Sequence, residues 1–389
     1  MSQDYISVAI EGDYIDSFIY SGTLFLVHGD SRITTYDWAS LLQSTLHKSS
    51  EGSVTTQIYE FLKDCRCGMV ADAGVSTINI EQQQLEDQLI FDLQLNGWPT
   101  DINIYSNCFY IASEDGVDEL AFDYQSKSLK PDERFRVWHE YAYRVSANDG
   151  HRLAIAAGAN GVITATPRKG YIKENEDVIK LLEIDSHDCE WIGQNLIANS
   201  SSGAYVSTFP ALPERPNGPL PPGYWREFEA ARRSRPDTRK VELDGDISVA
   251  YAWIAGSKLF SFLSNGELSV ERMPISDEDA NSQEISDVEG KFLNLKTGFK
   301  MESSILAARS GSFGAVIETS SNLITVTERG CQILANRPVS WRVFPRARNY
   351  LNHLHVVEDD QLIIHAFLAF EGANGDQSDR FGISTDDVR

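Results

Sequence analysis

Long apolar runs, a secretion signal and an ordered cysteine framework are all missing from this sequence. No apolar run approaches the roughly 20 residues that a helix needs to cross a bilayer. The N-terminal segment MSQDYISVAIEGDY is acidic and lacks the basic and apolar regions of a signal peptide. The 5 cysteines are scattered and odd in number, which is a poor basis for disulfides. We therefore expect a soluble, cytoplasmic protein in a reducing compartment.

Basic residues are also scarce. The chain has 34 Lys and Arg residues against 57 Asp and Glu residues, and its formal net charge is -23. A charge of this sign is repelled by nucleic acids and by anionic membranes at long range. We expect no direct nucleic-acid partner and no membrane partner. The charge favours either a basic protein partner or no more than a well-solvated surface, and both interpretations stay open.

Motifs that identify an enzyme or a cofactor site are absent. No Walker loop occurs, and Ser312 has the spacing of a nucleophile elbow but lies between two expected strands, not between a strand and a helix. His353 and His355 alternate along one expected strand, yet no acidic or Cys partner follows at metal-ligand spacing. Cys65 and Cys67 resemble half of a zinc site without the other half. The sequence therefore predicts no cofactor, no metal and no catalytic residue.

A repeated strand pattern is the main feature that the sequence does have. Residues 15–38 alternate apolar and polar side chains in three short runs, which Ser21-Gly22 and Gly29-Asp30-Ser31 separate as turns. The same rhythm returns six more times, and most units carry a fourth run. The seven units begin near Ile15, Asp101, Tyr143, Cys189, Ile247, Ser303 and Leu351.

The two ends of the chain complement each other. The sixth unit is expected to end with a strand from Val339, and the seventh to continue from Leu351 and Gln361 to a third strand at residues 381–385. A fourth strand is then missing at the end, while residues 5–12 form a spare strand at the start. The N-terminal strand is therefore predicted to complete the last unit and close a ring without a free sheet edge.

This all-β pattern resembles a seven-bladed β-propeller of four-stranded blades over residues 1–389, similar to WD40-type propellers in blade plan and in a period of roughly 40 residues. No unit carries the Gly-His and Trp-Asp signatures of that family; Tyr36-Asp37-Trp38 has the order reversed. No family-specific function therefore carries over. A pair of β-sandwich domains and a count of six or eight blades stay open as alternatives.

Long insertions are expected between the third and fourth strands of their units, and therefore on one rim of the disc. Residues 38–87 are predicted to be helical, with helices over 38–46 and 54–62. Repeat proteins usually bind their partners on the face that carries the insertions. An equal alternative is that these insertions are only tolerated at the surface and have no binding role. The insertions are residues 38–87, 125–133, 168–176, 211–238 and 274–290.

The fourth-unit insertion stands out because six of the chain's 13 prolines lie between Pro210 and Pro222, followed by a short expected helix rich in arginine. This local positive charge is expected to bind an acidic partner or phosphate, or alternatively to dock on the protein's own acidic surface. The residues predicted to contact a partner are Tyr224, Trp225, Arg226, Arg232, Arg233, Arg235 and Arg239.

Two functions follow from the sequence as hypotheses. The first is a non-catalytic propeller scaffold that mediates protein–protein interaction within a multi-protein intracellular assembly. The alternative is a lactonase-like propeller hydrolase with a divalent metal in the axial channel. The residues considered for that metal are Asn103, Asp185, Glu190, Asn195 and Glu302.

Overall fold

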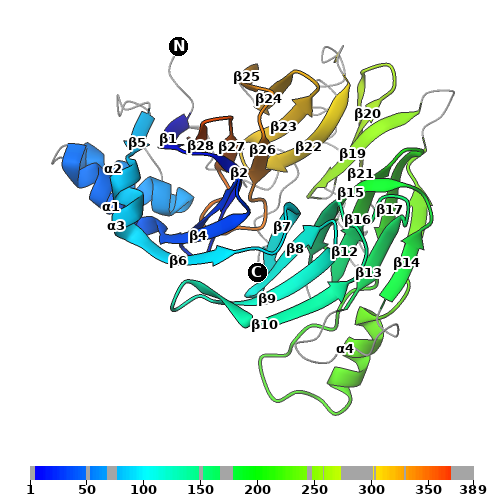
Figure 1. The fold of residues 1–389 in the computed structure, drawn as a ribbon. Coiled ribbons are helices and arrows are strands. Elements are labelled where there is room, and N and C mark those ends of the chain that lie inside the picture. The colour runs from blue at the N-terminus through cyan, green and yellow to red at the C-terminus, as the bar shows by residue number, and fades with distance from the viewer. Residues whose placement is uncertain are drawn as a thin grey trace.

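Seven antiparallel sheets surround a central axis in the computed structural model, so the predicted seven-bladed β-propeller is confirmed (Figure 1). The alternatives of two β-sandwiches and of six or eight blades are wrong. No described helix is long and apolar enough to cross a membrane. The structure describes residues 5–49, 53–67, 77–148, 152–166, 178–242, 248–256, 258–272, 301, 304–327 and 330–368.

Each blade is a meander, because consecutive strands joined by tight turns pair as neighbours. The first strand of each blade lies nearest the axis. Blade 1 contains β2 (Tyr14–Tyr20), β3 (Thr23–His28), β4 (Arg32–Asp37) and β6 (Leu89–Gln94). Blade 2 contains β7 (Pro99–Tyr105), β8 (Cys108–Ser113), β9 (Gly116–Asp123) and β10 (Ser128–Trp138). Blade 3 contains β11 (Arg144–Ala147), β12 (Leu153–Ala156), β13 (Val162–Ala165) and β14 (Val178–Leu182). Blade 4 contains β15 (Ser186–Ile192), β16 (Asn195–Ser200), β17 (Gly203–Thr208) and β18 (Asp237–Lys240). The described strands of blade 5 are β19 (Val249–Ala255), β20 (Lys258–Leu263) and β21 (Leu268–Arg272). Blade 6 contains β22 (Ile305–Gly311), β23 (Gly314–Thr319), β24 (Asn322–Thr327) and β25 (Gly330–Asn336). The fourth strand expected near Phe292 in blade 5 lies outside the described residues.

The N-terminal strand closes the ring as predicted. Blade 7 contains β26 (Ser340–Val343), β27 (His353–Val357), β28 (Gln361–Phe367) and β1 (Tyr5–Glu11). β1 pairs with β28 along its whole length, from Tyr5 opposite Phe367 to Glu11 opposite Gln361. The first and the last described strands are thus joined in one sheet, and β28 is not left as a free edge.

The predicted strand assignment for the last two blades is wrong by one strand. The run from Val339 is not the outer strand of blade 6; as β26 it is the inner strand of blade 7, and β25 completes blade 6. The strand expected at residues 381–385 lies outside the described residues, and blade 7 already has four strands without it. β25 lacks a strong alternating pattern because it is mostly exposed, with its first four residues open to solvent.

The helical segment between β4 and β6 covers the outer edge of blade 7. It contains α1 (Trp38–Ser49), α2 (Ser53–Lys63) and, not predicted, the short η1 (Cys65–Cys67), β5 (Thr77–Ile80) and α3 (Gln82–Gln88). β5 pairs with β1 in parallel, from Ser7 opposite Thr77 to Ile10 opposite Ile80. Buried Trp38, Leu41 and Phe61 pack in one core with the apolar residues of β1 and β28. Blade 1 therefore protects the edge at which the ring closes.

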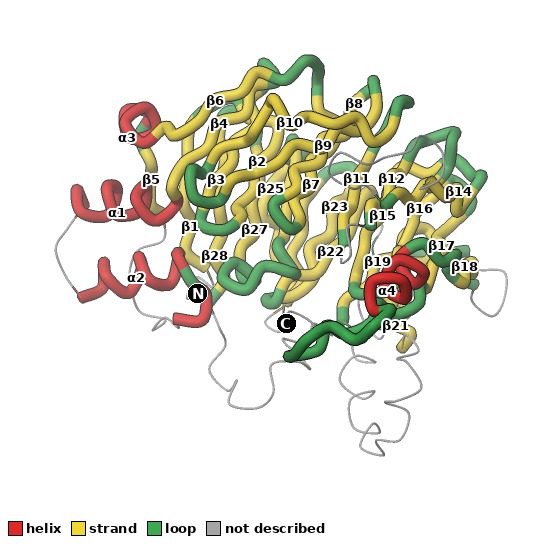
Figure 2. Tube along the Cα trace, turned by 90° about the horizontal axis from the view of Figure 1, so that it is seen from below, coloured by secondary structure: helices red, strands yellow, loops and turns green. Residues whose placement is uncertain are grey.

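The loops after the first and third strands emerge on one face, because successive strands alternate in direction. This face carries α1 and α2 and also residues 209–236, which contain α4 (Tyr224–Arg232) (Figure 2). The expected insertion at residues 125–133 is wrong, since β9 and β10 are joined by a turn at residues 124–127 and β10 continues to Trp138. A long connection that was not expected, residues 344–352, joins β26 to β27 on the same face.

Three histidines of blade 7 are buried in the closure region. His353, His355 and His365 are 0%, 1% and 6% exposed. His365 Nδ1 lies 3.0 Å from Ser7 Oγ on β1, and His355 Nδ1 lies 3.0 Å from Ser17 Oγ on β2. Burial lowers the pKa of His353 to about 3 and the pKa of His365 to about 4. These side chains are therefore neutral wherever the fold is intact at moderate pH.

The buried histidines predict a loss of stability in mild acid. Below pH 6.5 the unfolded chain binds protons at these side chains and the folded chain does not, so the free energy of unfolding falls as pH drops toward about 4. At pH 5 each buried histidine lowers the free energy of unfolding by about 2 kcal/mol relative to its value at pH 7.5. Urea denaturation at several pH values measures this slope. His365→Gln should flatten it, and the exposed-site control His139→Gln should not; equal slopes in both variants would contradict the prediction.

Candidate functional site

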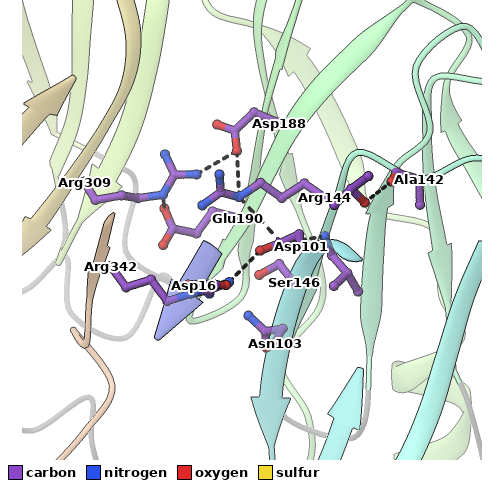
Figure 3. A network of polar contacts seen from close by, with 12 residues as sticks. Asp16, Asp101, Asn103, Ala142, Arg144, Ser146, Asp188, Glu190, Arg309 and Arg342 are labelled. Carbon is purple, nitrogen blue, oxygen red and sulfur yellow. Dashed lines mark hydrogen bonds and ion pairs between the residues drawn. The ribbon is translucent and has the colours of Figure 1, made fainter. Parts of the chain in front are cut away.

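Each of the seven innermost strands contributes a charged or hydrogen-bonding side chain to a network at the axis, and Figure 3 shows those of β2, β7, β11, β15, β22 and β26. The inner strands are otherwise short and largely apolar, so these side chains lie at corresponding places around the channel. They are Asp16 on β2, Asp101 on β7, Arg144 on β11, Asp188 and Glu190 on β15, Tyr251 on β19, Arg309 on β22 and Arg342 on β26.

One half of this axial network joins blades 7, 1, 2, 3 and 4. Arg342 Nε lies 2.7 Å from Asp16 Oδ1, and its Nη2 lies 2.8 Å from Asp101 Oδ1. Arg144 Nε lies 3.8 Å from Asp101 Oδ2 and 3.3 Å from Asp188 Oδ1. Each arginine thus bridges carboxylates from two different blades.

The other half joins blades 4, 5 and 6. Arg309 Nη2 lies 2.7 Å from Asp188 Oδ1, and its Nε lies 2.6 Å from Glu190 Oε2. The Tyr251 hydroxyl donates to Asp188 Oδ2 at 2.5 Å and accepts from Arg309 Nη1. Since Asp188 also pairs with Arg144, the contacts form one continuous network across all seven blades.

The network keeps Asp188 ionised although it is buried. Burial alone would raise the pKa of Asp188, but the guanidinium groups of Arg309 and Arg144 lower it well below its usual range. Burial raises the pKa of Glu190, with Arg309 opposing the rise. The two carboxylates of β15 are therefore unequal, and Asp188 is the permanent anion of the pair.

A cavity of about 920 Å³ lies in the channel beside this network. Its wall consists of the ends of the inner strands, including Tyr20 and Tyr105, and its floor includes Arg144, Arg309 and Glu190. The connection between β26 and β27 lines its mouth, together with the end of α2. The cavity therefore opens on the face that carries the insertions, and its volume suits a small-molecule ligand.

The residues considered for a divalent metal are not brought together. Asn103 and Glu190 line the cavity, but Asp185 is exposed at the start of blade 4 and Asn195 accepts a hydrogen bond from Thr208. Glu302 lies outside the described residues. Among the described residues, no group of three or more His, Cys, Asp or Glu side chains has the geometry to hold a metal ion.

The predicted partner-binding residues divide into a buried and an exposed set. Tyr224 and Arg232 are 6% and 5% exposed; the Tyr224 hydroxyl donates to the Pro213 carbonyl, and Arg232 pairs with Glu229. Both contacts lie within the insertion: Tyr224 joins the start of α4 to the preceding proline-rich segment, and the Arg232 pair lies within the helix. The exposed set comprises Trp225, Arg226, Arg233, Arg235 and Arg239.

A buried arginine of blade 3 fixes α4 to the disc. Arg152 Nη2 donates to the Ala231 carbonyl at 2.8 Å, and its Nε donates to the Arg232 carbonyl at 3.3 Å. Its guanidinium also lies 5.0 Å from the centre of the Phe209 ring. A cationic side chain at the C-terminal end of a helix donates hydrogen bonds to the last backbone carbonyls, which have no partner within the helix.

Neither the axial network nor the role of Arg152 was predicted from the sequence. The available signal was one charged residue in each of several otherwise apolar first strands, such as Asp16 in YIDSFIY and Arg342 in SWRV. That signal becomes meaningful only once the first strands are known to face one axis. Arg152 gave no local signal, because its partners lie about 80 residues further along the chain.

Removing one member of the axial network should strongly destabilise the fold. Arg309→Met leaves Asp188 and Glu190 short of a buried cation, and we expect a loss of about 3–5 kcal/mol in the free energy of unfolding. The matched control is Arg32→Met, which breaks an exposed pair with Asp92 and should cost no more than about 1 kcal/mol. Urea denaturation compares the two; a smaller loss for Arg309→Met than for Arg32→Met would be inconsistent with the network.

Arg152→Met should release α4 while the ring stays folded. The helix carbonyls then lose their buried donor, so limited proteolysis within residues 211–236 should accelerate several-fold. The exposed control Arg226→Met keeps the wild-type cleavage rate. Cleavage spread evenly over the chain in Arg152→Met would instead indicate that Arg152 supports the whole disc.

Comparison with known proteins gives a likeness of fold only. No protein-family model matches the chain, and no curated protein matches it in sequence. The β-propeller domain of Myceliophteria thermophila Cps50 (Swd1) is 10% identical, with a TM-score of 0.51 over 93% of this chain and 99% of that one.

Two further propellers are similar. The Neurospora crassa Pan2 WD40 domain is 7% identical, with a TM-score of 0.48 over 95% of this chain and 98% of that one. BBS1N, solved in complex with ARL6DN, is 10% identical, with a TM-score of 0.48 over 96% of this chain and 98% of that one. The likeness to the Cps50 propeller agrees with the seven blades of the structure and confirms the predicted propeller fold.

Proposed function

We propose that this chain is a non-catalytic propeller scaffold that binds a protein partner within a multi-protein assembly of the cytoplasm. The observation that carries the proposal is the presentation of Trp225, which is 58% exposed on a helix that is itself anchored to the disc. A large aromatic side chain held out to solvent on a fixed element has the properties of an interface anchor.

Neighbouring side chains hold the Trp225 ring in place. Its ring centre lies 5.3 Å from that of Tyr224 and 5.7 Å from that of Phe228, both nearly perpendicular to it. Tyr224 is buried and hydrogen-bonded, so the cluster rests on a rigid base. An ordered ring loses little conformational freedom when it is covered, and this favours binding.

The charge around Trp225 supports an acidic partner surface. Arg226 follows Trp225 in the chain, and Arg233 and Arg235 are exposed further along the same insertion, in a chain whose net charge is -23. The insertion is attached to the disc by Arg152 from blade 3. Among the exposed arginines, Arg233 pairs with Glu229 of its own helix, and Arg239 lies 3.8 Å from Glu271 of blade 5. The pair with Glu271 supports, for Arg239, the alternative that this region docks on the protein's own acidic surface.

The hydrolase alternative has weaker support. The axial carboxylates that would hold a divalent ion accept instead from arginines, with Asp101 between Arg342 and Arg144 and Asp188 between Arg144 and Arg309. A metal would have to displace these cations and leave them buried without partners.

Affinity capture from the native host tests the scaffold function. Wild-type protein should retain a stoichiometric partner that Trp225→Ala loses, because the anchor of the interface is removed. Trp98→Ala is the matched control, since Trp98 is 53% exposed but lies in the connection from β6 to β7, on the opposite face. Retention of the partner by Trp225→Ala, or its loss from both variants, would overturn this assignment.

A further inference from the structure

Two tyrosines are exposed on the face of the disc that carries the short connections. Tyr141 and Tyr143, in the connection from β10 to β11, are 39% and 45% exposed. The loops after the second and fourth strands emerge on this face, which is opposite the insertions. The two ring centres lie 4.6 Å apart, with an angle of 67° between the ring planes. Tyrosine is common at binding interfaces, because it combines a large apolar ring with a polar hydroxyl.

The backbone beneath the tyrosine pair is fixed. Ala142, between the two tyrosines, is fully buried. Its N–H donates to the Ser113 carbonyl at 3.1 Å, and its carbonyl accepts from Thr100 Oγ1 at 2.5 Å. The N–H of Tyr143 donates to the Ala156 carbonyl at 2.8 Å. The pair is therefore anchored to blades 2 and 3 and needs little ordering when a partner covers it.

The Tyr143 ring lies over a turn glycine and beside a carboxylate. A β-carbon at Gly158, in the turn between β12 and β13, would lie 2.7 Å from the Tyr143 ring and 3.7 Å from Asp185 Oδ1. Gly158 has a φ of 57°, and its N–H and carbonyl pair with the backbone of Ser186. The ring and the carboxylate thus flank one rigid turn. A guanidinium placed there stacks on the ring and pairs with the carboxylate.

The surface around the tyrosine pair is negative. In blades 2 to 4, the connections on this face contain five acidic residues and no Lys or Arg. None of the five forms an ion pair with another described residue, so their charge is not cancelled locally. The connections are residues 114–115, 139–143, 157–161, 183–185 and 201–202, and the acidic residues are Glu114, Asp115, Glu140, Glu183 and Asp185.

The arginines of the adjoining strands are paired elsewhere. Arg136 pairs with a buried aspartate of β9, and Arg144 belongs to the axial network. The negative surface acts on the tyrosines themselves: burial raises the pKa of Tyr141, and the neighbouring Tyr143 and Glu114 add to the rise. A cation that reaches this surface therefore meets unpaired carboxylates beside two aromatic rings.

We propose that this tyrosine surface binds an arginine-rich segment of a protein partner. A guanidinium stacks on aromatic rings and pairs with carboxylates, so it matches both features of the surface. A second copy of this chain carries the same net charge of -23, and nucleic acid is also negative, so both are repelled. The inference does not rest on the Trp225 surface, which lies on the opposite face and faces a partner of opposite charge.

Fluorescence anisotropy on the full chain tests the proposal with two labelled peptides. In one peptide arginine alternates with glycine, and in the other glutamine replaces each arginine. The arginine peptide should bind at least about tenfold more tightly than the glutamine peptide, and more weakly as salt rises. Tyr143→Ala and Asp185→Asn should each weaken its binding by about fivefold, and the first does so without a change of charge. A thermal melt checks the folding of both variants, and Asp185→Asn decides the outcome if Tyr143→Ala does not fold.

Each variant has a matched control that should leave the affinity within about twofold. Tyr124→Ala removes a ring that is 54% exposed in the turn between β9 and β10, on the insertion face, and Asp87→Asn removes an exposed charge on α3. Equal weakening by a variant and its control would overturn the proposal. So would absence of binding by the arginine peptide, equal binding of the two peptides, or unchanged binding in the folded variants. Trp225→Ala should bind the arginine peptide as the wild type does, which separates this test from partner capture.

Discussion

The axial network of arginines and carboxylates is the constraint on which the arrangement of the blades depends. A ring of seven sheets leaves a space at its centre that apolar side chains from short inner strands do not fill. Here the space is crossed by paired charges, and each charged group has partners from neighbouring blades. Burying such groups is costly when any partner is missing, so the network favours one set of blade positions over others.

The same network separates the two faces of the disc. It forms part of the floor of the cavity, whose mouth lies among the insertions, and Arg144 and Arg309 belong to both the floor and the network. The third-to-fourth strand connections place α2 at this mouth and residues 209–236 on the same face of the disc. The cavity and the Trp225 surface therefore share one face, while the other face carries short connections such as the one that contains Trp98.

The blade pattern was predictable where strands are buried on both faces. β3 and β8, for example, are continuous apolar runs bounded by turn residues, and these runs are visible in the sequence. β25 was missed because its first four residues are exposed, so its composition is weakly constrained. β5 alternates in burial but has only four residues, which is too short to stand out in the sequence. Once β25 was overlooked, β26 was counted with the wrong blade.

The candidate sites were less predictable than the fold, for a different reason. The arginine-rich helix could be found because its composition differs locally from the rest of the chain. The cavity could not, because Arg144, Arg309 and Arg346 are far apart in the sequence and converge only when seven inner strands meet. Arg346 also lies in a connection that was expected to be short.

The pairing of β1 with β28 has a consequence for biosynthesis. Ser7 and His365, which share a hydrogen bond, are 358 residues apart in the chain. The first strand to leave the ribosome must therefore wait for one of the last before it finds its place, and contacts of such separation form slowly. During that interval the unpaired edges of β1 and of the helical segment against it are open to chaperones, and the newly made chain is vulnerable until translation is nearly complete.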